Sequence, residues 1–470
     1  MNRKMDYNEI CRSIVTEEVT SNHRIIKLHN TDLLTVNIRN GANEMFIELG
    51  LGLKFGTFMR LKSGLAHLIE HLISNKINER IKDIDGRVIS RTHLDTMVLG
   101  FSVSYLKSQY IEDDECIEVV DLFDIIIDSI KEACNLDYIK ENLENEINII
   151  KSELKMTEND PTELFRCDYI GYLSKDKFMI DAAVGGRPDR MDELNDPEMV
   201  KDAMEFLLSS NPRFNLGVPD SVEINTLRLF TYYNYAICDG YREYLNVEPR
   251  PLNTNMLEEN FFKPDYIKIK ERKEGDLKIV EIESSDPDNI PRYLMLKPGE
   301  ISTKKDWIKN VVLTNLLNTI ILSDTSSMVW KEFREKGETY GIYNELHMDR
   351  MIGEFSNEVF VTSFIELWDR EMYKKIFELI KNKVHLKYID KEFDKAKKTN
   401  ITMYLTYSAV FSSLDYSMND FGVSFQDLVI ATREFRKEEF TKYVEYILDE
   451  SNCMLIVPVP ESDSTIWCKD

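Results

Sequence analysis

Strand-like and helix-like patterns of apolar and polar positions alternate along the first half of the chain. The run Phe46–Gly56 is largely apolar and ends on glycine, which predicts a β-strand. Residues 87–104 are rich in Val, Thr, Ile and Phe, and they predict strands around a turn near Leu94–Asp95. Apolar residues at helical spacing predict helices over Leu61–Asn78, Cys116–Ala133 and Tyr138–Met156.

The third of these predicted helices has one continuous apolar stripe. The stripe is formed by Ile139, Leu143, Ile147, Ile150 and Leu154. Glu146 and Glu153 flank it seven positions apart, which is two helical turns, so we expect both carboxylates on one face of the helix. Because they border the apolar stripe, we also expect them to be half-buried.

A weak internal repeat connects the two halves of the sequence. Residues 205–219 and 445–458 each contain a helix end, a short loop with an asparagine, and a strand that closes on proline. The copies begin 240 positions apart, about half the chain, and predict two similar domains in tandem. Pro249, Pro251 and Pro264 indicate a linker at 247–265, which leaves 1–246 and 266–470 as the two domains.

Composition narrows the classes of partner. The 470 residues have a net charge of −24, which argues against nucleic acid and against an anionic membrane surface as partners. No apolar run approaches the roughly 18 residues of a membrane-spanning helix, and Met1–Thr20 lacks the apolar core of a secretory signal. The seven cysteines are scattered without a C-x-x-C pair, which predicts reduced thiols in a cytoplasmic protein.

Candidate chemistry is concentrated in the segment 63–71, SGLAHLIEH. His67 and His71 are one helical turn apart, so both imidazoles project from one face, as two ligands of a tetrahedral zinc ion require. Glu70 lies beside them, where it can take a proton from water activated by the metal. This order, H-x-x-E-H, is the inverse of the commoner H-E-x-x-H. A zinc site also needs a third protein ligand, for which Glu146 and Glu153 are both candidates.

The motif and its context resemble the M16 metallopeptidases, the group of pitrilysin, insulin-degrading enzyme and mitochondrial processing peptidase. The family motif Gly-x-Ala-His-x-x-Glu-His matches Gly64–His71, and its downstream Glu-x6-Glu pattern matches Glu146 and Glu153. The resemblance implies that Glu153 is the third zinc ligand and that Glu146 orients a ligand. The spacing from His71 is a few residues longer than the family pattern, so Glu146 remains the alternative third ligand.

The resemblance covers nearly the whole chain and implies its architecture. The expected fold class is α+β, with two tandem similar domains that each contain a mostly antiparallel sheet with helices packed on one face. Together they would form half of a clam-shell chamber. The edge strand around Val88–Ser104 would dock extended peptide by main-chain hydrogen bonds. Ile89 and Ser90 stand where the family has Asn-Ala.

A second motif lies at residues 333–341, FREKGETYG. It resembles the family element in which an arginine and a tyrosine hold the substrate, with one residue fewer between the two. By that resemblance Arg334 would donate to a substrate carbonyl and Tyr340 to the oxyanion of the transition state.

Together the motifs predict a zinc-dependent endopeptidase that cleaves short or unfolded peptides inside an enclosed dimeric chamber. Clearance of spent peptides and processing of precursor or leader peptides are both compatible with the sequence. The presence of both motifs on one chain favours a homodimer, and a heterodimer with a related M16 subunit is the alternative. A non-catalytic subunit that serves as scaffold or peptide-binding partner is the rival from another class.

Overall fold

The computed structural model of the chain describes residues 12, 14–20, 23–28, 31–39, 44–52, 61–92, 96–104, 119–158, 160–173, 185–208, 212–220, 226–232, 269–297, 303–338, 343–347, 362–406 and 425–460. These residues divide into two units. The first comprises the described residues up to Lys155 and those of 185–232, and the second comprises those of 156–173 and from Ile269 onward. The linker proposed at 247–265 and the turn at Leu94–Asp95 lie outside the described residues, so the predicted domain bounds remain a prediction.

Within its described residues the first unit contains an eight-stranded sheet of order β1-β2-β3-β8-β4-β7-β5, with β6 also paired to β7. Its strands are β1 (Ile14–Thr20), β2 (His23–Leu28), β3 (Thr31–Arg39), β4 (Glu44–Gly52), β5 (Gly86–Val88), β6 (Arg91–Thr92), β7 (Thr96–Ser104) and β8 (Pro212–Pro219). The pair β3–β8 is parallel and the remaining pairs are antiparallel. The sheet is therefore mostly antiparallel, as expected from the sequence.

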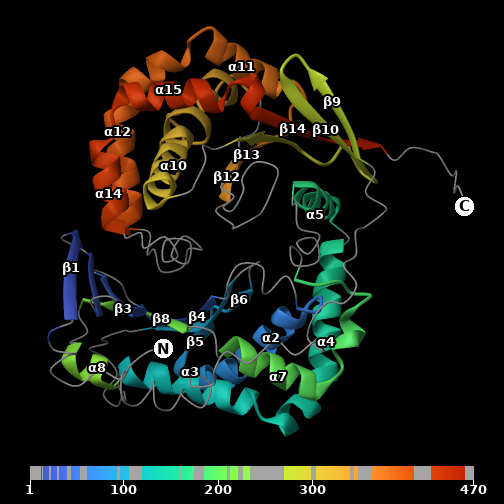
Figure 1. Ribbon diagram of the computed structural model, residues 1–470, viewed down its shortest axis with the longest axis vertical. Coiled ribbons are helices and arrows are strands. Elements are labelled where there is room, and N and C mark those ends of the chain that lie inside the picture. Colours follow the sequence, from blue (N-terminus) through green and yellow to red (C-terminus); the bar gives the residue numbers. More distant parts are fainter. Residues whose placement is uncertain are drawn as a thin grey trace, which may run out of the picture. The chain divides into compact units, whose positions relative to one another are not determined.

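Helices cover one face of this sheet (Figure 1). They include α2 (Leu65–Ile81), α3 (Val119–Ala133), α4 (Leu136–Glu158), α7 (Pro197–Leu208) and α8 (Thr226–Tyr232). Side chains alternate across each strand, so Ile47 and Leu49 of β4 enter the helix-covered core, whereas Glu48 between them points to the opposite face. Short 3₁₀ helices at Lys82–Ile84 and Met191–Leu194 complete the described part of this unit.

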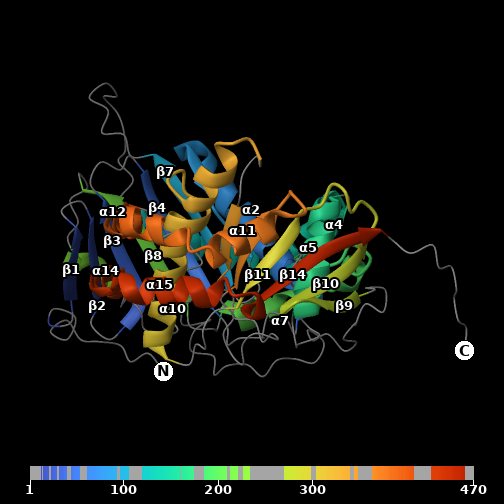
Figure 2. The same ribbon diagram turned by 90° about the horizontal axis from the view of Figure 1, so that it is seen from above.

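The second unit contains a six-stranded sheet of order β12-β13-β11-β14-β10-β9 among its described residues. Its strands are β9 (Ile269–Glu274), β10 (Leu277–Ser284), β11 (Arg292–Leu296), β12 (Tyr343–His347), β13 (Thr362–Leu367) and β14 (Cys453–Pro460). Its helices are α5 (Pro161–Leu173), α10 (Lys304–Leu317), α11 (Met372–Lys381), α12 (His385–Thr406), α14 (Phe425–Glu434) and α15 (Lys437–Ile447), with short π-helical segments at Asn318–Leu322 and Trp330–Arg334 and a 3₁₀ turn at Glu450–Asn452. Figure 2 shows β14 beside β10, its parallel neighbour.

The two sheets repeat one pattern of strand pairing. In the first unit β8 lies between parallel β3 and antiparallel β4, and in the second unit β14 lies between parallel β10 and antiparallel β11. Each of these inserted strands follows a helix, α7 or α15, at the two segments that the sequence repeat singled out. The α+β class with two similar units, each built on a mostly antiparallel sheet, is thus confirmed.

The expected helices of the first unit occur close to their predicted bounds. Helix α2 begins at Leu65 rather than Leu61 because Gly64 has a left-handed φ of 79° and forms the N-cap. It continues past Asn78 to Ile81 because Ile77 and Ile81 extend the buried apolar face. All five apolar residues of the stripe on α4 are buried. Within the residues described, no helix combines the length and apolar character that crossing a bilayer requires.

Candidate metal centre

Helix α2 buries one face in the core, and the two histidines lie on its other face. Leu65, Leu68 and Leu72 are buried, and the helix packs against β5, β6, β7 and α3. His67 and His71 lie on the half-buried face, and their ring centroids are 4.7 Å apart in an edge-to-face arrangement. The local rule that residues four apart share a helix face therefore holds here.

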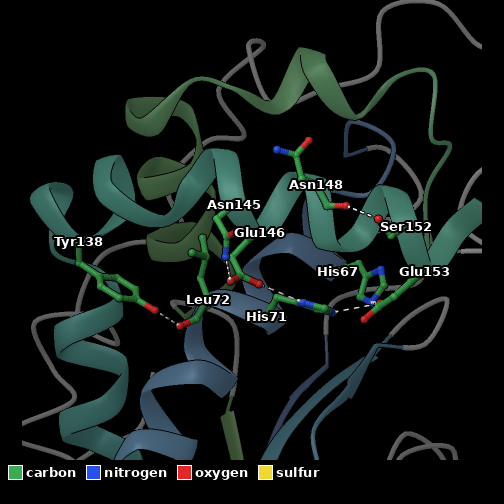
Figure 3. Close-up of polar contacts among 9 residues, drawn as sticks. All are labelled: His67, His71, Leu72, Tyr138, Asn145, Glu146, Asn148, Ser152 and Glu153. Atoms are coloured by element: carbon green, nitrogen blue, oxygen red, sulfur yellow. Dashed lines mark hydrogen bonds and ion pairs between the residues drawn. The ribbon is translucent and has the colours of Figure 1, made fainter.

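Helix α4 supplies the acidic side of the site (Figure 3). Its start is tied to α2 by Tyr138, whose hydroxyl donates to the Leu72 carbonyl at 3.1 Å. The two glutamates differ in burial: the side chain of Glu146 is 5% exposed and that of Glu153 is 49% exposed. The expectation that both are half-buried is wrong for each of them: Glu146 is buried, with its carboxylate against His71, and Glu153 is exposed.

The candidate ligand atoms converge at one point. Nε2 of His67 and Nε2 of His71 lie 3.8 Å and 3.5 Å from the same atom, Oε2 of Glu153. Ligand atoms about 2.0–2.1 Å from a tetrahedral zinc ion are separated by roughly 3.3 Å, so the donor set fits the ion with little adjustment. Within the part of the chain that the structure describes, this is the one cluster of three His, Cys, Asp or Glu ligands within 4.8 Å of one another.

Glu146 holds the opposite nitrogen of His71. Its Oε2 lies 3.3 Å from Nδ1 of His71, and Asn145 Nδ2 donates to its Oε1 at 3.4 Å. Burial by itself would lower the pKa of His71, but the hydrogen bond to Glu146 and the charge of Glu153 outweigh it, so the pKa is raised. With Nδ1 directed at a carboxylate, Nε2 is left to face Glu153, which is the arrangement common among zinc-bound histidines.

His67 is held from behind by a glycine turn. A Cβ added to Gly185, whose φ is 69°, would lie 3.0 Å from Nδ1 of His67, so the backbone of Gly185 approaches the ring closely. Burial, and then the charge of His71, lowers the pKa of His67 to about 4. The imidazole is therefore neutral near pH 7, the form in which histidine binds metals.

Glu70 lies on α2 between the histidines and the sheet edge. Thr92 of β6 donates a hydrogen bond of 2.7 Å to its Oε2. Burial raises the pKa of Glu70, opposed by this hydrogen bond and by the charge of His71. A raised pKa brings a carboxyl group closer to the working pH of a general base. The sequence did not single out Thr92, because its contact to Glu70 spans 22 residues and has no local pattern.

Ile89 and Ser90, which stand where the family has Asn-Ala, affect the hydrogen bonding at the edge of the sheet. The Ile89 N–H donates to the Gly100 carbonyl at 2.9 Å, whereas the Gly100 N–H donates to the Ser90 hydroxyl at 3.2 Å. The Ser90 side chain thus takes part in the pairing with β7 at the point where the chain passes from β5 to β6. The register of β5 and β6 with β7 is the same on either side of this point. Among the described strands, β5 and β6 pair with β7 alone.

The second predicted element belongs to the second unit. Arg334 ends the π-helical segment Trp330–Arg334, with its guanidinium 5.7 Å from the centroid of the Trp330 ring. A turn follows, in which Gly337 has a φ of 75° and its N–H donates to the Arg334 carbonyl. Tyr340 lies outside the described residues, so the structure brings His67, Glu70, His71, Glu146 and Glu153 together and leaves the role of Arg334 and Tyr340 a prediction.

Comparisons with known proteins identify the fold. No protein-family model matches the sequence, and no curated protein matches it either. Solved structures do match: a protease from Helicobacter pylori has a TM-score of 0.60 at 14% identity over 93% of this chain and 99% of its own. The peptidase M16 inactive domain from Pseudomonas fluorescens has a TM-score of 0.58 at 13% identity over 96% of this chain and 98% of its own.

Pitrilysin matches with a TM-score of 0.54 at 12% identity. The match covers 96% of this chain and 47% of pitrilysin, so the chain spans about half of that protein's length. At these identities the likeness concerns the fold alone. The chain has the fold of M16 peptidases, and both catalytic and inactive proteins occur among those it resembles.

Proposed function

We propose that the chain is a zinc-dependent endopeptidase of the M16 type. The observation that supports this most strongly is the convergence of His67, His71 and Glu153 within 4.8 Å, with Glu70 beside them and hydrogen-bonded to Thr92. A fold of this kind without a catalytic role has no need for three converging ligand atoms and a half-buried carboxyl group next to them.

In this proposal His67, His71 and Glu153 hold the zinc ion, and Glu146 orients His71. Zinc, when bound, polarises the scissile carbonyl and makes the attacking water more acidic. Glu70 takes the proton from that water and passes it to the leaving amine. Thr92 engages Oε2 of Glu70, so we assign the proton transfer to Oε1.

Substrate binding is assigned to two places. Extended peptide pairs with the edge strand at β5 and β6, where main-chain groups rather than side chains supply the affinity. Arg334 and Tyr340 hold the substrate backbone and the developing oxyanion, as the resemblance of residues 333–341 implies. The substrates are short or unfolded peptides, including precursor or leader peptides, because an extended strand is the form that such an edge accepts.

The active assembly in this proposal is a dimer that encloses a chamber. The ligand set and the Arg334 motif on one chain favour a homodimer over pairing with a related subunit. The scattered cysteines, of which Cys134 and Cys453 are buried free thiols, favour a cytoplasmic location. Light scattering of the purified chain, combined with a cleavage assay, separates the homodimer from the heterodimer.

A non-catalytic scaffold is the second candidate, favoured by the likeness to an M16 inactive domain. The two functions are distinguished by metal content and turnover of the purified chain. We expect one zinc per chain, lost in His67→Ala, and cleavage of unfolded peptides that disappears in Glu70→Gln although zinc is retained. A wild-type chain that binds no zinc after reconstitution and cleaves no peptide would overturn the peptidase and support the scaffold.

A further inference from the structure

A buried carboxylate lies on the sheet face opposite the metal centre. Glu48 of β4 points away from the helix-covered core, and its residue is 0% exposed. Its Oε1 lies 3.4 Å from Nη2 of Arg91, and its Oε2 accepts a hydrogen bond of 3.3 Å from Asn215 Nδ2. Burying a carboxylate is unfavourable unless it is paired, and nothing in the proposed catalytic steps uses this group.

The pair reaches across a whole strand. Glu48 is opposite Gly100 in the β4–β7 ladder, and Arg91 is opposite Val98 in the β6–β7 ladder. β7 therefore lies between the two side chains. Gly100 leaves room for the contact, because a Cβ added there would lie 3.2 Å from Cγ of Glu48 and 2.5 Å from the Ile47 carbonyl oxygen.

β6 needs such an anchor because it is short and lies at the edge. It consists of Arg91 and Thr92 and pairs with β7 alone among the described strands. Successive residues of a strand point to opposite faces, so Arg91 reaches Glu48 on one face while Thr92 reaches Glu70 on the other. The backbone of these two residues thus joins the buried ion pair to the proposed general base.

We propose that Glu48 and Arg91 are positioning residues that fix β6 and thereby hold Thr92 against Glu70. The expected effect on kcat rests on the proposed function. The expected effect on the stability of β6 does not depend on that function. Burial raises the pKa of Glu48 to about 7, with Arg91 and Asn215 acting in the opposite direction. Burial therefore disfavours the charged form of Glu48, and Arg91 is the cation that offsets part of this cost.

The test compares Glu48→Gln, Arg91→Gln and the double variant with the wild type. Glutamine keeps the shape of Glu48 and can still accept from Asn215. All measurements are made above pH 7, where Glu48 is ionised in the wild type and the substitution leaves the charge on Arg91 unmatched. Glu392→Gln is the matched control, because Glu392 is a buried carboxylate of α12 in the second unit, 3.5 Å from Lys395. Amide hydrogen exchange over residues 86–92, zinc content, kcat and KM are measured for each.

We expect faster exchange over residues 86–92 in both single variants, with β2 and β3 unchanged and zinc retained. We expect kcat to fall by about tenfold or more while KM changes little, since a displaced catalytic group affects the reaction more than binding. Because the pair acts as a unit, the double variant is expected to be no worse than the worse single variant. Glu392→Gln should match the wild type in all four measurements.

Two results would overturn the inference. One is unchanged exchange over residues 86–92 in Glu48→Gln and Arg91→Gln. The other is faster exchange spread evenly over β2, β3, β4 and β7, which would make the pair a general stabiliser of the sheet. If the wild type cleaves no peptide, the proposed function fails, but the exchange measurement still decides whether Glu48 and Arg91 fix β6.

Discussion

His71 is held between two carboxylates of one helix: its Nδ1 lies 3.3 Å from Oε2 of Glu146 and its Nε2 lies 3.5 Å from Oε2 of Glu153. The seven-residue spacing on α4 places the two carboxylates two turns apart, and the ring of His71 spans the gap between them (Figure 3). This geometry assigns different roles to the two glutamates, because Oε2 of Glu153 is also within reach of His67.

The roles of the two glutamates can be separated by metal binding. Glu153→Gln removes a proposed ligand, and we expect the purified variant to contain little zinc. Glu146→Gln leaves the three ligands in place and loses the charge that orients His71, so we expect zinc affinity to fall by about 10- to 100-fold. Competition with a chromogenic chelator measures both affinities.

Glu144 provides the control for these variants, because it is an exposed glutamate on the same helix. Glu144→Gln should bind zinc as the wild type does. Strong zinc binding by Glu153→Gln together with its loss in Glu146→Gln would reverse the assignment and make Glu146 the third ligand.

The hydroxyl of Thr92 can be removed without changing the shape of the residue. Thr92→Val keeps a β-branched side chain in the strand but cannot donate to Glu70. A hydrogen bond to a charged group contributes about 1.5–3 kcal/mol, so we expect kcat to fall by about tenfold or more with zinc content unchanged. Thr92→Ser restores the donor and should recover most of the rate; a serine variant as slow as the valine variant would show that the hydroxyl is not what matters.

Local periodicity explains why part of the site was predictable from the sequence. His67 and His71 share a face because they are four residues apart on one helix. Glu146 and Glu153 share a face because their separation of seven residues is about two helical turns. The contact between these faces of α2 and α4 depends on tertiary packing, and in the sequence only the family resemblance suggested it. The paired sheets followed from the repeat at 205–219 and 445–458, because each copy forms a complete helix–strand unit.

The supporting residues could not be predicted, because each contact joins segments far apart in the sequence. Thr92 reaches Glu70 through the pairing of β6 with β7, and Glu48 reaches Arg91 across β7. Gly185 approaches His67 from a turn more than a hundred residues away. A glycine pair such as Gly185-Gly186 is the only local signal among these, and it indicates a turn without saying what lies beside it.

The turn at Gly185 offers a test of how tightly His67 must be held. Gly185→Ala places a methyl group 3.0 Å from Nδ1 of His67, at a φ of 69° where alanine is disfavoured by about 1–2 kcal/mol. We expect lower thermal stability and a weaker zinc affinity, measured by calorimetric titration. Gly275→Ala is the matched control: its φ is 63°, its nearest neighbour is Oε2 of Glu450, and it lies in the second unit.

Gly275→Ala is expected to lose a similar amount of stability and to bind zinc normally. If both variants bind zinc as the wild type does, the contact with Gly185 does not position His67.

Glu48 gives the stability of the first unit a characteristic dependence on pH. Its pKa is raised from 4.5 to about 7 in the folded chain, chiefly by burial and against the charge of Arg91. The folded state therefore holds this proton more tightly than the unfolded state does. The resulting stabilisation is fully present below pH 4.5 and is lost as the pH rises through about 7.

The difference in unfolding free energy between the wild type and Glu48→Gln isolates this effect, because the variant has no proton to lose at that position. We expect the wild type to lose about 2.5 kcal/mol relative to the variant between pH 5 and pH 8, because part of the full effect of 1.36 kcal/mol per pKa unit is already lost at pH 5. Urea unfolding of the metal-free proteins at four or five pH values measures it, and other titrating groups cancel because both proteins contain them. A difference that stays constant over this range would mean that Glu48 keeps an ordinary pKa in the folded chain. In that case Arg91 and Asn215 would compensate fully for its burial.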